Sequence, residues 1–185
     1  MNLHEIQSLP WLLPPDEEKT KAFKKLTVSA DANAKQALNV LLDYSKHSLD
    51  LRQLHRLTSK LHEWRRLNKI ENASNLAQLK VGVLGTSSTQ FIASALEATG
   101  LRFGLDIKTI EADFGMVLQT ALNPRNIFYD AKCDAILVQL DQSFLDTDLP
   151  MGDRQKEELY IETTTNEIRM LAEKLYASTN STIVL

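Results

Sequence analysis

The sequence of 185 residues contains a single cysteine, Cys133, and this scarcity excludes two kinds of stabilisation. One cysteine cannot form an intramolecular disulfide, nor can it build a cysteine-rich zinc site. Free thiols persist in reducing compartments, so we expect a cytoplasmic protein. Cys133 itself begins an apolar segment, and we interpret it as a small buried residue.

Long apolar runs are missing as well. No segment approaches the ~20 apolar residues that span a bilayer. The first residues, MNLHEIQSLPWLLPP, lack the basic start and apolar centre of a secretory signal, so we expect no membrane partner. Apolar residues still make up 43% of the chain and charged residues 24%, which is typical of a globular domain with a buried core.

Neither sign of charge dominates, although the two halves of the chain differ. The formal net charge is -3; residues 1–80 carry 13 Lys and Arg against 9 Asp and Glu, and residues 81–185 carry 8 against 15. So small a basic excess is screened over ~10 Å in ordinary salt. The basic stretch KLHEWRRLNK comes without a stacking platform or a recognition motif, so we expect no nucleic-acid partner.

Residues 1–78 have a helical pattern, and we predict them to form an N-terminal helical region. After three prolines comes a short charged helix, and Asp31 is a suitable N-cap for the segment ANAKQALNVLLDYSKH. A second helix over SLDLRQLHRLTSKLHEWRRL carries an apolar stripe at helical spacing: Leu51, Leu54, Leu57, Leu61, Trp64 and Leu67 or Asn68. Two amphipathic helices joined by a short turn predict a helical hairpin.

From residue 79 onward, strands alternate with helices. Apolar segments predict strands over residues 80–84, 106–112, 133–141 and 181–185, and the segments between them predict helices over 89–100, 114–124 and 153–177, the first ended by Gly100 as a C-cap. This alternation predicts an α/β domain over 79–185 with a parallel, doubly wound, flavodoxin-like sheet. Because the last strand has no covering helix after it, we expect the chain to be the front part of a longer protein, with this domain incomplete.

Ligands of open parallel sheets bind beyond the carboxyl ends of the strands. Three such ends carry polar residues or glycine: Gly85, Thr86, Ser87, Ser88 and Thr89 after the first strand, Asp113 to Gly115 after the second, and Asp141 with Gln142 after the third. We expect these segments to meet in one crevice.

The hydroxyl run after Gly85 has two interpretations. Ser87 and Gln90 have the spacing of a capping box, with the serine as N-cap of the next helix. Alternatively, Ser87 is a nucleophile or part of an anion site. The motifs of phosphate-binding loops and of dinucleotide-binding turns are absent. We favour the cap, although a cap residue can also line a site.

A serine nucleophile needs a base, and the histidines lie in the wrong place for one. His4, His47, His55 and His62 all precede the α/β part. His55 and His62 are two helical turns apart, ~10 Å by helix rise, so we expect no metal there. An acidic stretch, Asp141, Asp146, Asp148, Asp153, Glu157 and Glu158, lacks the spacing of a calcium loop. We interpret it as a solvated loop that leads into a helix N-terminus.

The segments KVGVLGTSST and EADFGMVLQTALNPRNIFYDAKCDAILVQLD resemble the front half of FkbH-like proteins, in the HAD-IIIC group of the haloacid dehalogenase superfamily. That family similarly has a glycine-hydroxyl turn after its first strand. The resemblance covers about residues 80–141, and its most telling positions are Gly85, Gly115, Gln119, Leu122, Asn123, Pro124, Tyr129, Asp134 and Asp141.

The resemblance implies a front domain similar to SGNH hydrolases, followed by a catalytic HAD domain that carries an Asp-x-Asp motif and Mg²⁺. Such proteins activate a glyceryl unit from a phosphate ester and load it onto an acyl carrier protein, in polyketide or related secondary-metabolite biosynthesis. No segment similar to the DLDNTLWGG stretch of that catalytic domain occurs here, so the resemblance implies no cofactor in this chain. Within the SGNH pattern Ser87 stands at the nucleophile position and Gly115 near the oxyanion glycine, but Thr86 replaces the usual aspartate.

Three hypotheses follow. The first is an accessory domain whose Gly85, Thr86, Ser87, Ser88, Gly115 and Asp141 line a site that binds a phosphorylated glyceryl substrate or an acyl carrier protein. The second is an SGNH-type esterase or acyltransferase that uses Ser87 with a histidine from beyond Leu185. The third is an interaction module in which the front helices form a homo-oligomer.

Overall fold

The computed structural model describes residues 12–26, 34–68, 76–144 and 152–185. The chain forms two compact units, one from Met1–Gln78 and Ser94–Ile107 and the other from Leu79–Ala93 and Lys108–Leu185. The segment from Ser94 to Ile107 therefore folds with the front helices, whereas the sequence pattern alone divides the chain between residues 78 and 79.

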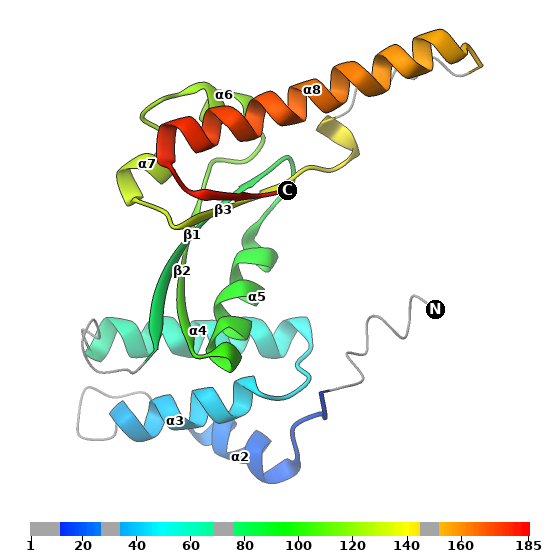
Figure 1. Ribbon diagram of the computed structural model, residues 1–185. Helices are drawn as coiled ribbons and strands as arrows, with labels where there is room; N and C mark the ends of the chain where they lie inside the picture. The colour runs from blue at the N-terminus through cyan, green and yellow to red at the C-terminus, as the bar shows by residue number, and fades with distance from the viewer. Residues whose placement is uncertain (1–11, 27–33, 69–75, 145–151) are drawn as a thin grey trace. The chain divides into compact units, whose positions relative to one another are not determined.

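The front unit is built from amphipathic helices (Figure 1). They are α2 (Glu17–Lys25), α3 (Ala34–Ser45) and α4 (Leu51–Asn68). Asp16 caps α2 by accepting a hydrogen bond from the Lys19 backbone N–H at 2.7 Å. Leu57, Leu61 and Trp64 on the predicted stripe of α4 are fully buried. Leu51 is the exception, because it stands at the exposed first position of the helix, 63% accessible. Asp31, the predicted cap of α3, lies outside the described residues.

Helix α5 (Gln90–Gly100) ends at Gly100, as the sequence predicts, but Gly100 is not a left-handed cap. Gly100 has right-handed helical angles, and a 3-10 turn, η1 (Leu101–Phe103), continues the helix. The left-handed residue that stops it is Gly104, with φ 73°. Gly100 is needed for packing instead, since a Cβ there would lie 2.7 Å from the side chain of Ile107. The predicted end of α5 is therefore confirmed, whereas the left-handed cap follows the 3-10 turn instead.

An ion-pair cluster lies inside the front unit and centres on Arg65. Its guanidinium donates to Asp106 Oδ1 (Nε at 3.0 Å, Nη2 at 2.5 Å), to Glu97 Oε2 (Nη1 at 2.7 Å) and to the carbonyl of Ile107 (2.6 Å). The carboxylates of Glu97 and Asp106 are only 4% and 2% exposed. His62 Nε2 lies 2.5 Å from the same Glu97 oxygen at the outer side. Both buried acids thus share Arg65 as a cationic partner, and Glu97 also contacts His62.

The sheet has four parallel strands in the order β2-β1-β3-β4, as the sequence pattern predicts. The strands are β1 (Ala77–Gly85), β2 (Leu105–Glu111), β3 (Ala135–Gln139) and β4 (Thr182–Val184). The β1–β3 register places Val83 beside Leu137 and Gly85 beside Gln139. Since β2 lies on one side of β1 and β3 on the other, the order reverses next to β1, as in doubly wound sheets.

Three helices of the second unit cover one face of the sheet (Figure 1). They are α6 (Val117–Leu122), α7 (Ile127–Ala131) and α8 (Arg154–Thr179). Ile136 and Val138 of β3 are buried in the same core as Leu171 and Leu175 of α8. Phe128 of α7 is fully buried, and a Cβ at Gly82 would lie only 2.6 Å from its ring. Glycine at that strand position makes room for the phenyl ring. In the described part of the chain, no helix is long and apolar enough to cross a membrane.

Cys133 is buried as expected, 6% exposed, and its burial raises the pKa of the thiol to about 11. A thiol that stays protonated and covered reacts slowly. We expect iodoacetamide at pH 8 to label the folded protein at least tenfold more slowly than the urea-unfolded protein, measured by intact mass. Equal rates in the two states would contradict this burial. Because the native pKa exceeds the unfolded one, the thiol's contribution to stability should be present below pH 8 and decline as pH rises toward 11.

Candidate functional site

The hydroxyl run after β1 lies at the carboxyl edge of the sheet and is joined there to β3. Thr86 N–H donates to the Gln139 carbonyl at 3.1 Å, which continues the β1–β3 pairing by one residue. The Thr86 hydroxyl accepts a hydrogen bond from the Asp141 N–H at 3.0 Å. Gly85 is needed at this point because a Cβ would lie 2.6 Å from the Thr89 methyl and 2.9 Å from the Gln139 amide oxygen. The first and third strand ends therefore meet, as predicted.

Ser87 does not cap the next helix. Its hydroxyl donates to the Gln139 side-chain oxygen at 3.0 Å. Helix α5 begins only at Gln90, so Thr89 is the residue that precedes it, and the Ala93 N–H bonds to the Thr89 carbonyl at 2.9 Å. The capping box between Ser87 and Gln90 is therefore wrong, because the turn uses two more residues before the helix starts.

Thr89 connects the first strand end to the second. Its side chain is buried and donates to Glu111 Oε2 at 2.6 Å, at the end of β2. Around this contact lies a small cavity of about 240 Å³, lined by Gly85, Ser87, Ser88, Thr89, Glu111, Ala112 and Phe114. All three strand ends thus contribute to one edge, although the cavity itself is formed by the first two.

A second hollow of about 250 Å³ adjoins the first, with Ala112 lining both. Its wall comes from α6 and from the start of α7: Asp113, Met116, Gln119, Thr120, Asn123, Asn126 and Ile127. Asn126 is almost fully buried and caps α7, accepting from the N–H groups of Phe128 and Tyr129 at 3.1 Å each. Its amide also donates to the Asn123 carbonyl at 3.0 Å. This wall is therefore held rigidly.

Two of the predicted site residues stand at the margins of this edge. Gly115 lies in the exposed turn between β2 and α6 with φ 71°, and no atom lies within 4 Å of where its Cβ would be. Asp141 stands just after β3, where its N–H bonds to Thr86 and its carbonyl accepts from the Phe144 N–H, opening the short helix η2 (Gln142–Phe144). Neither residue lines the cavity beside Ser87.

The chemistry available at this edge is that of hydrogen bonding. An amide oxygen is not basic at neutral pH, so Gln139 cannot take the proton from Ser87 as a histidine would. His55 and His62 stand exposed on α4, and His4 lies outside the described residues. Across residues 12–26, 34–68, 76–144 and 152–185, no cluster of three or more His, Cys, Asp or Glu side chains is placed to hold a metal ion.

The acidic stretch is partly accounted for by the start of α8. Asp153 caps this helix by accepting from the Lys156 N–H at 3.3 Å, and Glu157 accepts from the Gly152 N–H at 2.8 Å. Carboxylates are stabilised at that end by the unpaired N–H groups and the helix dipole. Asp146 and Asp148 lie outside the described residues.

Two residues of the candidate site were not predicted from the sequence, Gln139 and Glu111. Each is the last residue of its strand. The Gln139 side chain accepts a hydrogen bond from the Ser87 hydroxyl, and the Glu111 side chain accepts one from the Thr89 hydroxyl. Their position at the end of an apolar segment could have indicated them, because ligands of parallel sheets bind at the carboxyl ends of the strands.

The chain is thus an α/β domain with an open parallel sheet, and in such sheets the carboxyl edge is where ligands bind. The family model described as "FkbH, N-terminal domain" matches residues 80–184. The chain belongs to this family, as the resemblance of the strand and turn motifs implied.

A solved structure supports the fold. It is described as the N-terminal part of the protein BF1531 from Bacteroides fragilis, containing a phosphatase domain complexed with Mg. The match has a TM-score of 0.52 and 20% sequence identity, and covers 68% of this chain and 31% of that chain. Our chain thus spans about a third of the length of that structure. No curated protein gave a match.

Proposed function

We propose that this chain is the accessory domain of an FkbH-like glyceryl or acyl transferase, and that it docks an acyl carrier protein for a catalytic HAD domain farther along the protein. The proposal that this domain is not catalytic rests on one observation: the Ser87 hydroxyl donates its hydrogen bond to the amide oxygen of Gln139, which is not a base. The family match to residues 80–184 supports the wider assignment. The proposal places the protein in the cytoplasm, in polyketide or related secondary-metabolite biosynthesis, with Mg²⁺ in the catalytic domain.

The size of the edge cavities favours a protein partner over the phosphorylated substrate. Volumes of about 240 and 250 Å³ lie below the range of ~300–1,000 Å³ that is usual for small-molecule sites. Beside them the segment from the β2 end through α6 exposes large apolar side chains: Phe114 72%, Leu122 56%, Leu118 44% and Met116 41%. Clustered exposed apolar groups are typical of protein interfaces.

Carrier docking is tested by titrating the chain with a holo acyl carrier protein and following NMR shifts. We expect Phe114→Ser to weaken binding at least fivefold, since truncation of an interface aromatic usually costs more than ~1 kcal/mol. Phe91→Ser is the matched control, because Phe91 is also exposed (62%) but lines neither edge cavity. Equal losses in the two variants, or no binding by the parent protein, would contradict the proposal.

The esterase alternative has a separate test. If Ser87 is no nucleophile, Ser87→Ala should leave the ester hydrolysis rate of the full-length protein, measured with p-nitrophenyl acetate, within about twofold of the parent rate. Loss of the activity in Ser87→Ala, with unchanged circular dichroism, would make Ser87 catalytic and would replace the docking proposal by hydrolysis.

A further inference from the structure

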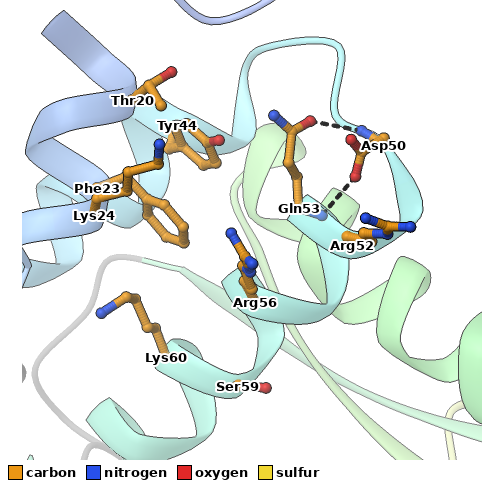
Figure 2. Close-up of a pocket in the computed structure, with 10 residues that line it drawn as sticks. All are labelled: Thr20, Phe23, Lys24, Tyr44, Asp50, Arg52, Gln53, Arg56, Ser59 and Lys60. Carbon is orange, nitrogen blue, oxygen red and sulfur yellow. Dashed lines mark hydrogen bonds between the residues drawn. The ribbon is translucent and has the colours of Figure 1, made fainter. Parts of the chain in front are cut away.

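A hollow larger than the two edge cavities belongs to the front unit. It has a volume of about 580 Å³ and is formed by α2, the end of α3 and the N-terminal half of α4 (Figure 2). That volume falls in the usual range for small-molecule sites. The hollow also precedes residues 80–184, so the family match does not account for it.

Positive charge predominates around this hollow. Lys24, Arg52, Arg56 and Lys60 line it, against the single lining carboxylate of Asp50. That carboxylate is engaged in capping α4: Asp50 Oδ1 accepts from the Gln53 N–H, and the Gln53 side chain accepts from the Asp50 N–H, both at 2.8 Å. The positive end of the α4 dipole adds to the cations.

Most of these cations are free to meet a ligand. Within the described residues, Lys24, Arg52 and Arg56 form no salt bridge, and all three are exposed. Lys60 is held in place, because its ammonium donates to the Leu26 carbonyl at 2.6 Å and lies 5.7 Å from the centroid of the Phe23 ring. Figure 2 shows Arg56 and Lys60 extending from α4 toward the side where Phe23 and Tyr44 lie.

The opposite wall is aromatic. Phe23 and Tyr44 stack with ring centroids 4.1 Å apart and parallel planes, and both rings line the hollow although little of their surface is exposed. Burial raises the pKa of the Tyr44 phenol, and Asp50 acts in the same direction, while Thr20, Arg56 and Gln53 oppose them. The phenol therefore stays neutral at physiological pH, and the wall offers an apolar surface with a hydrogen-bonding rim.

We propose that this hollow binds a small phosphate monoester, with its phosphate among Lys24, Arg56 and Lys60 and its apolar body against Phe23 and Tyr44. A phosphate carries about two negative charges at neutral pH and three equivalent oxygens. The hollow is lined by four cations and one carboxylate, that of Asp50. This excess of positive charge suits a doubly charged phosphate ligand better than a singly charged carboxylate ligand. The planar guanidinium of Arg56 donates two parallel hydrogen bonds to phosphate oxygens, which a solvated lysine cannot do.

The experiment is a calorimetric titration of the 185-residue chain with phenyl phosphate, inorganic phosphate and benzoate in low salt. We expect saturable one-site binding of phenyl phosphate, with inorganic phosphate and benzoate each at least fivefold weaker. Arg56→Gln should weaken phenyl phosphate at least tenfold. Arg66→Gln is the matched control, since it removes the same charge from the same helix outside the hollow, and should change binding less than twofold.

Each contrary result has a definite meaning. Equal losses in Arg56→Gln and Arg66→Gln would show diffuse attraction and overturn the site. If benzoate binds as tightly as phenyl phosphate, the hollow has no preference for a doubly charged phosphate. If inorganic phosphate binds as tightly as phenyl phosphate, the aromatic wall does not contribute to binding. Either result would overturn the proposal. Lack of saturation by the parent protein would overturn the whole proposal. Because the hollow and the sheet edge belong to different units, none of these results depends on carrier docking.

Discussion

Replacing Arg65 by methionine is expected to lower the free energy of unfolding by about 3–5 kcal/mol, because two buried carboxylates then lose their cation. Arg65 donates to both Glu97 and Asp106, whose side chains are almost inaccessible to water. Methionine keeps most of the packing volume, so the loss reports the unpaired charge. The measurement is urea unfolding followed by circular dichroism, with the slope of the transition checked for two-state behaviour.

Arg66→Met is the control for this prediction. Arg66 is the exposed neighbour on the same helix, and its replacement should change the stability by no more than about 0.5 kcal/mol. Adding Glu97→Gln to Arg65→Met should restore part of the loss, since one of the two buried carboxylates that lost the guanidinium is then replaced by a neutral amide. If Arg65→Met costs no more than Arg66→Met, the cluster does not stabilise the front unit.

The second large effect is expected in the other unit, at Phe128. Phe128→Ala should cost about 3–5 kcal/mol, since it removes a fully buried ring from the core beneath α8. Gly82→Ala should cost about 1–3 kcal/mol by itself, because the new methyl would lie 2.6 Å from that ring. With the ring absent the methyl has space, so the two losses should not add.

A double-mutant cycle measures this coupling. We expect Gly82→Ala to be neutral or stabilising in the Phe128→Ala background, a change of at least about 1 kcal/mol from its effect in the parent protein. Simple additivity would mean that the ring moves aside at little cost and that glycine is not required at position 82. The same unfolding measurement serves all four proteins.

The strands and long helices could be predicted from the sequence because each is a local pattern. The apolar run at residues 80–84 and the stripe through Leu57, Leu61 and Trp64 are each visible within about 20 residues, and the structure buries them as expected. The parallel order followed from the alternation of strands and helices.

The features that were missed depend on register and on distant partners. Gln139 meets Ser87 because β3 pairs with β1 so that Gly85 stands beside Gln139, a relation that spans more than 50 residues. The acids bound by Arg65 lie 32 and 41 residues away from it. A local sequence pattern cannot reveal contacts between residues so far apart in the chain.

The division of the chain into units has a consequence for where this chain could be cut. The chain passes between the two units three times, within β1, α5 and β2, rather than through one loose linker. A gene fusion that borrowed only the matched residues 80–184 would carry Glu97 and Asp106 away from Arg65, leaving two acids and the buried Leu101 without the helices that cover them. We therefore expect residues 80–184 of this chain to fold poorly without the front helices.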